Sequence, residues 1–260
     1  MDTYNSLQLR EVFHIEFLRQ LARKVKAENY AVKGGVNLRL FFKSFRYSED
    51  MDLDARVIRS FQLKEAVMSI LASRAFRDNL KPFGITDIKP PDIVKAKQTE
   101  TTQRFKIHLF SSSGEDLFTR IEFSRRGFAG DTIVGAPDDA VLRAYKLPPI
   151  LVPHYDGPSA VVQKLLALAG RTSVQARDIF DLYVLSSQYA ASDKRIGGVS
   201  ADILSKAQAR VFEVEFEQFS DAVVSYLSIE DQELYNRPKS WEEIRLKTAS
   251  FIEEARPSHA

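Results

Sequence analysis

The chain contains no cysteine among its 260 residues. Disulfide scaffolds, thiolate zinc sites, iron–sulfur clusters and cysteine nucleophiles are therefore excluded. Histidine is scarce, and its spacing includes no H-E-x-x-H or H-x-H pattern, which argues against a histidine-bound metal phosphohydrolase. The four histidines are His14, His108, His154 and His259. A P-loop sequence and a G-x-S-x-G nucleophile elbow are also missing, so neither a P-loop ATPase nor an α/β-hydrolase is supported.

Long apolar runs and a dominant charge are lacking as well. No stretch of about 18 apolar residues occurs, so we expect no transmembrane helix. The polar start of the chain, MDTYNSLQLREVF, has no apolar core of a signal peptide, and we expect a cytoplasmic protein without a membrane partner. Lysine and arginine number 37 against 35 acidic residues, a net charge of +2. Any surface that binds nucleic acid must therefore be local.

Apolar periodicity predicts an α/β region followed by an all-α region. In the first region we expect helices near 7–28, 36–45 and 60–75, strands near 30–32 and 51–53, and a β-hairpin over 104–124. Four prolines between Pro148 and Pro158 mark a change of composition. Beyond them, helices are expected near 160–169, 176–189, 200–227 and 241–255. We therefore predict two domains, 1–150 and 151–260.

Two acids two residues apart are the first candidate for chemistry. On a strand, Asp50 and Asp52 point to one face, with their Cα atoms about 6–7 Å apart. Such acids repel each other unless a cation lies between them. Hard carboxylate ligands of this kind suit Mg²⁺, which combines a few carboxylates with substrate phosphates. Asp54 shares the face and is expected beyond the metal. The alternative is a solvated edge strand whose acids face water.

Two further segments fit the same chemistry. Lys33-Gly34-Gly35 separates a strand from a helix, where glycine lets backbone amides approach a phosphate at the helix N-terminus. A plain turn is the alternative. Glu122 lies between two apolar residues on the return strand of the predicted hairpin. It becomes a third ligand if that strand lies beside the paired acids, and is otherwise an exposed acid on an amphipathic strand.

The fourth segment, residues 163–183, combines cations and acids on predicted helices. Lys164 and Arg171 are seven residues apart and share a face if one helix continues that far. Arg177 is four residues from Asp181, a spacing at which oppositely charged side chains can pair on a helix. Ordinary surface charge is the alternative for this segment.

Together, these four segments resemble the nucleotidyltransferase pattern of the polymerase-β-like superfamily. That pattern is a Gly-Gly turn, an acid–apolar–acid strand and a later lone acid between apolar residues. More narrowly, KGGVNLRLFFKSFRYSEDMDLD and QKLLALAGR…RDIFDLY are similar to the AbiEii/AbiGii toxin family, which includes the MenT-type nucleotidyltransferase toxins. The resemblance covers about residues 33–183. It implies an α/β (α+β) fold with an N-terminal mixed sheet, flanking helices and a C-terminal all-α domain.

The resemblance also implies roles for individual residues. The catalytic residues would be Asp50, Asp52, Glu122 and Lys164. Of these, the three acids would bind the Mg²⁺ or Mn²⁺ ions of a two-metal mechanism, in which Asp50 and Asp52 bridge the two ions. Glu122 is a candidate for activating the attacking hydroxyl. The nucleotide would be bound by Lys33, Gly34, Gly35, Arg46, Ser48, Lys164 and Arg171. Asp178 and Asp181 match the RD-x-x-D motif of the family, for which a partly structural role is expected.

The implied reaction transfers a nucleoside monophosphate from an NTP to an acceptor hydroxyl. By resemblance the acceptor is the 3′ end of a tRNA, the protein is the toxin of an abortive-infection-type toxin–antitoxin system active in phage defence, and a cognate antitoxin is its partner. A protein hydroxyl is the second possibility for the acceptor. An inert nucleotide- or RNA-binding module is the alternative function, and the presence of all three acids argues against it.

An RNA acceptor requires a local basic surface. The candidates are Lys43, Arg46, Arg104, Lys106, Arg120, Arg125, Arg126, Lys164 and Arg171. Three of them share the predicted hairpin face with Glu122, namely Arg104, Lys106 and Arg120. The alternative is that these cations pair with acids such as Glu49, Glu115 and Asp116 and leave nothing for RNA.

Overall fold

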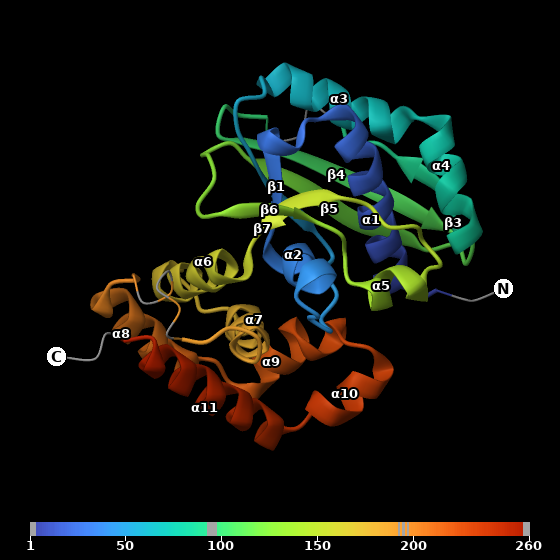
Figure 1. The fold of residues 1–260 in the computed structure, drawn as a ribbon. Helices are drawn as coiled ribbons and strands as arrows, with labels where there is room; N and C mark the ends of the chain where they lie inside the picture. The colour runs from blue at the N-terminus through green and yellow to red at the C-terminus, as the bar shows by residue number, and fades with distance from the viewer. Residues whose placement is uncertain (1–3, 93–97, 192, 194–195, 197, 257–260) are drawn as a thin grey trace. The chain divides into compact units, whose positions relative to one another are not determined.

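The structure, a computed structural model, describes residues 4–92, 98–191, 193, 196 and 198–256 (Figure 1). His259 lies outside these residues. The described chain divides into two compact units. The sheet unit comprises the chain up to Phe41, Tyr47–Phe128 and Thr132–Tyr155, and the helical unit comprises Phe42–Arg46, Ala129–Asp131 and the chain from Asp156 onward. The predicted domains, 1–150 and 151–260, stay a prediction.

A mixed seven-stranded sheet is the centre of the sheet unit. Its strand order is β3-β4-β5-β2-β1-β7-β6, with β2–β5 and β1–β7 parallel and the other pairs antiparallel. The strands are β1 (Tyr30–Lys33), β2 (Met51–Ala55), β3 (Ile85–Lys89), β4 (Thr102–Ser111), β5 (Asp116–Ser124), β6 (Thr132–Gly135) and β7 (Val152–Tyr155). The mixed sheet and the hairpin, which is β4 and β5, are confirmed.

The sequence patterns missed β3, β6 and β7. The stretch marked as a domain boundary by its prolines contains β7, in which Pro153 lies opposite Val134 of β6. A four-residue strand that includes proline shows no alternation of apolar and polar residues. Its place between β1 and β6 depends on backbone pairing with distant segments, so the sequence pattern could not indicate it.

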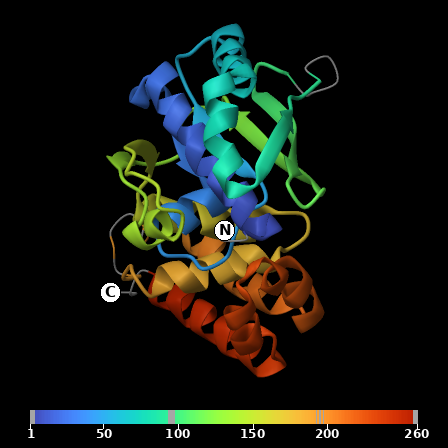
Figure 2. The same ribbon diagram turned by 90° about the vertical axis from the view of Figure 1, so that its right-hand side faces the viewer.

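Helices cover one face of this sheet. They are α1 (Ser6–Lys24), α2 (Gly34–Phe41), α3 (Ser60–Ala72), α4 (Arg74–Leu80) and α5 (Asp139–Ala144). Among them α1, α3 and α4 contact one another, and their apolar side chains form one core with Val32, Leu53 and Ile121 of the strands (Figure 2). Because strand residues alternate between faces, the residues between these apolar positions point to the opposite face, and many of them are charged.

Local chemistry explains where two of these helices begin or end. Asn5 caps α1 by accepting hydrogen bonds from the amides of Leu7 and Gln8, and the Gln8 side chain accepts from the amide of Asn5. The helix expected to run to residue 45 ends at Phe41. Lys43 adopts a φ of 52°, a left-handed conformation that an α-helix cannot continue through.

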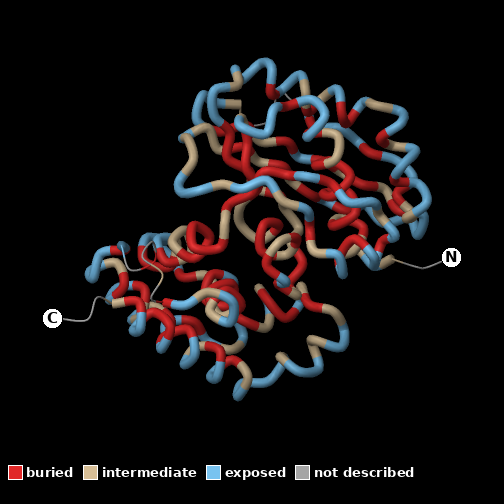
Figure 3. The backbone as a smooth tube through the Cα atoms, in the orientation of Figure 1, coloured by how far each residue is buried: buried red, intermediate tan, exposed pale blue. Residues whose placement is uncertain are grey.

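The helical unit confirms the expected all-α region. It contains α6 (Gly157–Gly170), α7 (Ala176–Ser186), α8 (Ala201–Arg210), α9 (Phe216–Ala222), α10 (Ile229–Tyr235) and α11 (Pro238–Glu254). Contacts join α7 to α6, α9 and α11, and the helices bury their inner faces (Figure 3). Trp241 stacks on Phe219 with ring centroids 4.3 Å apart, and its indole N–H donates to Val214 O at 2.9 Å. No helix within the described ranges is long and apolar enough to cross a membrane.

One helix prediction in this unit was wrong. Residues 200–227 were expected to form a single helix, but the chain is extended at Val214 and Glu215 between α8 and α9. Glu215 caps α9, and Gln218 accepts a hydrogen bond from the Glu215 amide. The buried indole of Trp241 is satisfied by the Val214 carbonyl, which a continuous helix would use internally.

Candidate active site

Four adjacent strands place a row of charged side chains across the sheet. The register pairs Arg104 of β4 with Glu122 of β5, Glu122 with Asp52 of β2, and Asp52 with Lys33 of β1. The signs along the row are therefore positive, negative, negative and positive. Glu122 is the direct neighbour of Asp52 on a parallel strand, which is the placement that the third-acid hypothesis requires.

Arginines of the hairpin pair with two of the three predicted acids. Arg104 Nε lies 2.6 Å from Glu122 Oε2, and Arg120 Nη2 lies 2.7 Å from Asp50 Oδ2. Side chains on neighbouring strands, or two residues apart on one strand, share a face, so the hairpin positions both cations beside the acids. The alternative that the basic residues pair with acids therefore applies to these two arginines, with Glu122 and Asp50 as the acids. Lys106, opposite Arg120 in the register, makes no ion pair with any described residue.

The pKa of the Asp50 carboxyl is shifted by burial and by neighbouring charges. Burial raises the pKa of this carboxyl above its usual range; repulsion from Asp52 and Glu49 raises it further, while Arg120 acts to lower it. The Ser48 hydroxyl donates to the Asp50 carbonyl at 2.8 Å and so fixes the turn that leads into β2. A bound cation would favour the charged form of this carboxyl, which burial disfavours.

Asp52 lies against the beginning of α2. Its carboxylate makes no hydrogen bond or ion pair with the part of the chain that the structure describes. Gly34 has a φ of 65°, and a Cβ added there would lie 3.4 Å from Asp52 Oδ2. Glycine is suited to this position because it adopts that conformation readily and leaves space beside the carboxylate. Gly35 follows as the next residue of α2.

Asp54 has a different role from the other acids. It is buried, and its carboxylate accepts from Lys33 Nζ at 2.5 Å and from the Tyr155 hydroxyl at 2.6 Å. Its negative charge is therefore balanced within the sheet, in agreement with its exclusion from the metal ligands. Tyr155 was missed because β7 was missed. The ammonium of Lys33, predicted to bind nucleotide, is engaged with Asp54 in this structure.

The three acids suit a divalent cation by type, and two of them are neighbours in the sheet. Carboxylate oxygens are the ligands that Mg²⁺ prefers, and Asp52 and Glu122 are neighbours on parallel strands. As the side chains stand, no three acid or histidine groups among the described residues converge on one point that could hold a metal ion. The physical reason is that Asp50 and Glu122 turn toward Arg120 and Arg104.

The other predicted residues form a buried charge network in the helical unit. Lys164 Nζ of α6 lies 2.9 Å from Asp178 Oδ1 and 2.6 Å from Asp181 Oδ2 of α7. Arg171 Nε lies 2.6 Å from Asp178 Oδ2, and Arg46 Nη2 lies 3.2 Å from Asp181 Oδ1. The side chains of both acids are fully buried. The RD-x-x-D motif thus binds the three cations that were predicted to contact nucleotide.

The ion pairs shift the pKa values of Lys164 and Asp178 in the directions that keep both groups charged at neutral pH. Burial acts to lower the pKa of Lys164, but Asp181 and Asp178 together raise it above its usual range. Burial acts to raise the pKa of Asp178, but Lys164 and Arg171 lower it. The contribution of Asp178 to stability is lost as pH falls through its lowered pKa, and that of Lys164 is lost as pH rises through its raised pKa.

Two details of this segment differ from the sequence interpretation. Arg177, four residues before Asp181, is exposed, and Asp181 pairs with Arg46 and Lys164 instead. The helix containing Lys164 ends at Gly170, so Arg171 follows it in an extended conformation and reaches Asp178 from there. In both cases the acids lie on the buried side of α7 and pair with cations that reach that side. Residue spacing along the sequence does not indicate which side is buried.

Comparisons with known proteins identify the family and similar folds. The model of the family described as nucleotidyl transferase AbiEii toxin, type IV TA system, matches residues 16–254. MenT4, a nucleotidyltransferase toxin from Mycobacterium tuberculosis, is similar in fold, with 17% identity and a TM-score of 0.63 over 96% of this chain and 84% of MenT4. A putative nucleotidyltransferase from Helicobacter pylori shows 18% identity and a TM-score of 0.60 over 97% of each chain. JHP933 from H. pylori shows 19% identity and a TM-score of 0.57 over 97% of this chain and 92% of its own. A comparison with curated proteins finds no match.

The buried network predicts a large effect of removing one acid. Asp181→Ala should destabilise the protein by about 3–5 kcal/mol, because Arg46 and Lys164 would each lose a partner inside the fold. Arg177→Ala, on the same helix but exposed, should change stability by no more than about 0.5 kcal/mol. Urea denaturation of both variants at neutral pH measures the difference. Equal stability of the two would contradict the structural role of the motif.

Proposed function

Because the chain belongs to the AbiEii nucleotidyl transferase toxin family of type IV toxin–antitoxin systems, we propose that it transfers a nucleoside monophosphate from an NTP to the 3′ end of a tRNA. The family implies a nucleotide substrate and an antitoxin partner. The observation that supports the chemistry is the row in which Asp52 and Glu122 are direct neighbours, with Asp50 just before the same strand. We place the activity in the cytoplasm, with a role in phage defence.

The acids of the sheet unit are proposed to hold the metal. When bound, Mg²⁺ or Mn²⁺ would neutralise charge on the attacking oxygen and on the pyrophosphate leaving group. Asp50, Asp52 and Glu122 are its proposed ligands, and Glu122 is proposed to accept the proton of the attacking hydroxyl. For the ion to bind, Asp50 and Glu122 must exchange the guanidinium groups of Arg120 and Arg104 for it.

The proposed nucleotide-binding residues are those that the family resemblance implies. In the sheet unit these are Lys33, Gly34, Gly35 and Ser48, where Gly34 leaves the backbone beside Asp52 accessible. In the helical unit they are Arg46, Lys164 and Arg171. The raised pKa of Lys164 supports its role, because the ammonium stays protonated while Asp178 and Asp181 hold it in place. Charge on the phosphates would favour contact with such fixed cations.

Asp52→Asn should abolish transfer while the fold survives. Mutating a residue that only hydrogen-bonds to a metal ligand typically lowers activity about 10–100-fold. Loss of a direct ligand should therefore lower activity by more than this. The thermal midpoint should stay or rise slightly, because a charge that repels Asp50 is removed. The measurement is transfer of label from each α-labelled NTP to total tRNA in Mg²⁺.

Glu49→Gln is the matched control, since Glu49 lies beside Asp50 but is not a proposed ligand. It should keep the wild-type rate. A folded Asp52→Asn protein that transfers nucleotide as fast as this control would show that the metal assignment is incorrect. Label on protein instead of RNA would favour the protein hydroxyl, and label on neither would favour an inert binding module.

The ion pair of Arg120 with Asp50 predicts competition with the metal. Arg120→Gln should bind Mn²⁺ a few-fold more tightly without nucleotide, because a partly exposed ion pair contributes at most about 1 kcal/mol. Lys106→Gln makes the same change in charge without removing an ion pair. Calorimetry with MnCl₂, with an EDTA blank, compares the two. Equal tightening in both variants would show that Arg120 does not compete for Asp50.

An RNA acceptor predicts a steep salt dependence. Transfer to tRNA at subsaturating tRNA should slow markedly between about 50 and 200 mM salt, because each phosphate contact releases a counterion. Arg125→Glu/Arg126→Glu, directly after β5, should weaken transfer further. Lys24→Glu/Lys26→Glu, near the end of α1, is the control. A transfer rate that is unchanged both by salt and by the charge reversal at Arg125 and Arg126 would argue against an RNA acceptor. It would favour a protein or small-molecule acceptor.

A further inference from the structure

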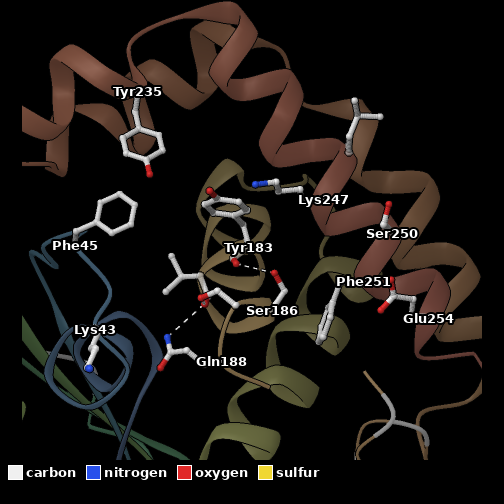
Figure 4. A pocket seen from close by; sticks show the side chains of 13 residues that line it. Lys43, Phe45, Tyr183, Ser186, Gln188, Tyr235, Lys247, Ser250, Phe251 and Glu254 are labelled. Atoms are coloured by element: carbon white, nitrogen blue, oxygen red, sulfur yellow. Dashed lines mark hydrogen bonds between the residues drawn. The ribbon is translucent and has the colours of Figure 1, made fainter. Parts of the chain in front are cut away.

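The helical unit contains a cavity of about 670 Å³ that the predicted site residues do not line (Figure 4). Its wall combines aromatic rings with two lysines: Phe45, Tyr183, Tyr235, Phe251, Lys43 and Lys247. Phe45 and Tyr235 are stacked with centroids 5.0 Å apart, and Lys247 Nζ lies 5.7 Å from the Tyr183 ring centroid. The volume is in the range of small-ligand sites, which is about 300–1,000 Å³.

The cavity and the buried charge network lie on different faces of α7. Asp181 and Tyr183 are two residues apart, which places them about 200° apart around the helix. The short segment 42–46 divides in the same way. Lys43 and Phe45 line the cavity, while Arg46 reaches Asp181. The cavity is therefore a second feature of the helical unit, formed partly by the segment that also supplies Arg46.

Charge and conformation at the cavity indicate a ligand. Lys43 and Lys247 make no ion pair within the described chain, and Glu254 is the one acid among the residues that line the space. Lys43 also adopts its unusual φ of 52° here. Strained backbone of this kind is found preferentially at binding sites. An anionic ligand with a flat ring system complements a wall that is aromatic and carries excess positive charge.

We propose that this cavity binds one nucleotide of the RNA acceptor, with its base against the rings of Tyr183 and Tyr235 and its phosphate near Lys247. The proposal rests on the RNA acceptor proposed above. Stacking on aromatic rings tolerates every base, and a lysine beside the rings contributes the backbone contact.

Binding of a short single-stranded RNA tests the cavity without the chemistry. Fluorescence anisotropy with a labelled oligonucleotide in EDTA measures affinity in the absence of metal and NTP. Tyr183→Leu and Tyr235→Leu should each weaken binding about 5- to 150-fold, the range for loss of one base–aromatic stack. Tyr183→Phe should keep wild-type affinity, because the ring face remains. Phe212→Leu replaces an exposed aromatic residue of the same unit outside the cavity and should bind as wild type.

A charge variant covers the case in which a leucine variant fails to fold. Lys247→Gln should make the fall of log affinity with log salt shallower, reducing the magnitude of its slope by about 0.7, the value for one phosphate contact on a single strand. Lys239→Gln, in the same helix but outside the cavity, should leave the slope unchanged.

The outcomes separate this proposal from the proposed function. Leucine variants that bind RNA like Phe212→Leu, together with an unchanged slope for Lys247→Gln, would overturn the cavity proposal even if tRNA is the acceptor. RNA binding through the cavity without any transfer to RNA would support the cavity and overturn the proposed acceptor. Cavity variants that lose affinity for the purified antitoxin but keep their affinity for RNA would assign the cavity to a protein partner and overturn the proposal.

Discussion

Repulsion between neighbouring carboxylates is the constraint on which the candidate site depends. Asp52 and Glu122 are paired in the register of two parallel strands, and Asp50 lies just before one of them. Like charges opposite one another destabilise a sheet unless cations offset them. The hairpin of β4 and β5 supplies those cations, since Arg104 meets Glu122 and Arg120 meets Asp50. The arrangement is therefore stable as it stands and contains carboxylates that a divalent ion could recruit.

The acids differ in how firmly they are held. Asp54 is buried and bound by both Lys33 and Tyr155, whereas Asp52 makes no polar contact within the described residues and lies against Gly34. An acid that is fully satisfied stabilises the sheet, and an acid that is not remains available to a ligand. This difference within one face supports Asp52 as the central residue of the proposed metal site. It also assigns Asp54 to the fold instead of the chemistry.

In the helical unit, the buried charge network and the cavity lie on opposite faces of α7. Three cations surround two fully buried acids on one face, and a cavity with aromatic rings and two lysines lies on the other. The segment 42–46 contributes Arg46 to the network and Phe45 to the cavity. The two faces are therefore connected by a few residues of backbone.

Local patterns in the sequence determined a large part of this protein. The alternation around Asp50 and Glu122 indicated strands with their acids on the polar face, and the turn at residues 111–116 indicated the hairpin, because side-chain direction on a strand depends only on position along it. The tertiary structure alone decided that β2 lies beside β5, that Arg120 meets Asp50, and that Lys164 is held by Asp178 and Asp181. Strands β3, β6 and β7, and the cavity formed by Phe45 and Tyr235, were likewise outside the reach of the sequence. Strand order and buried ion pairs depend on which distant segments pair and pack together. The spacing of apolar and charged residues along the sequence does not contain that information.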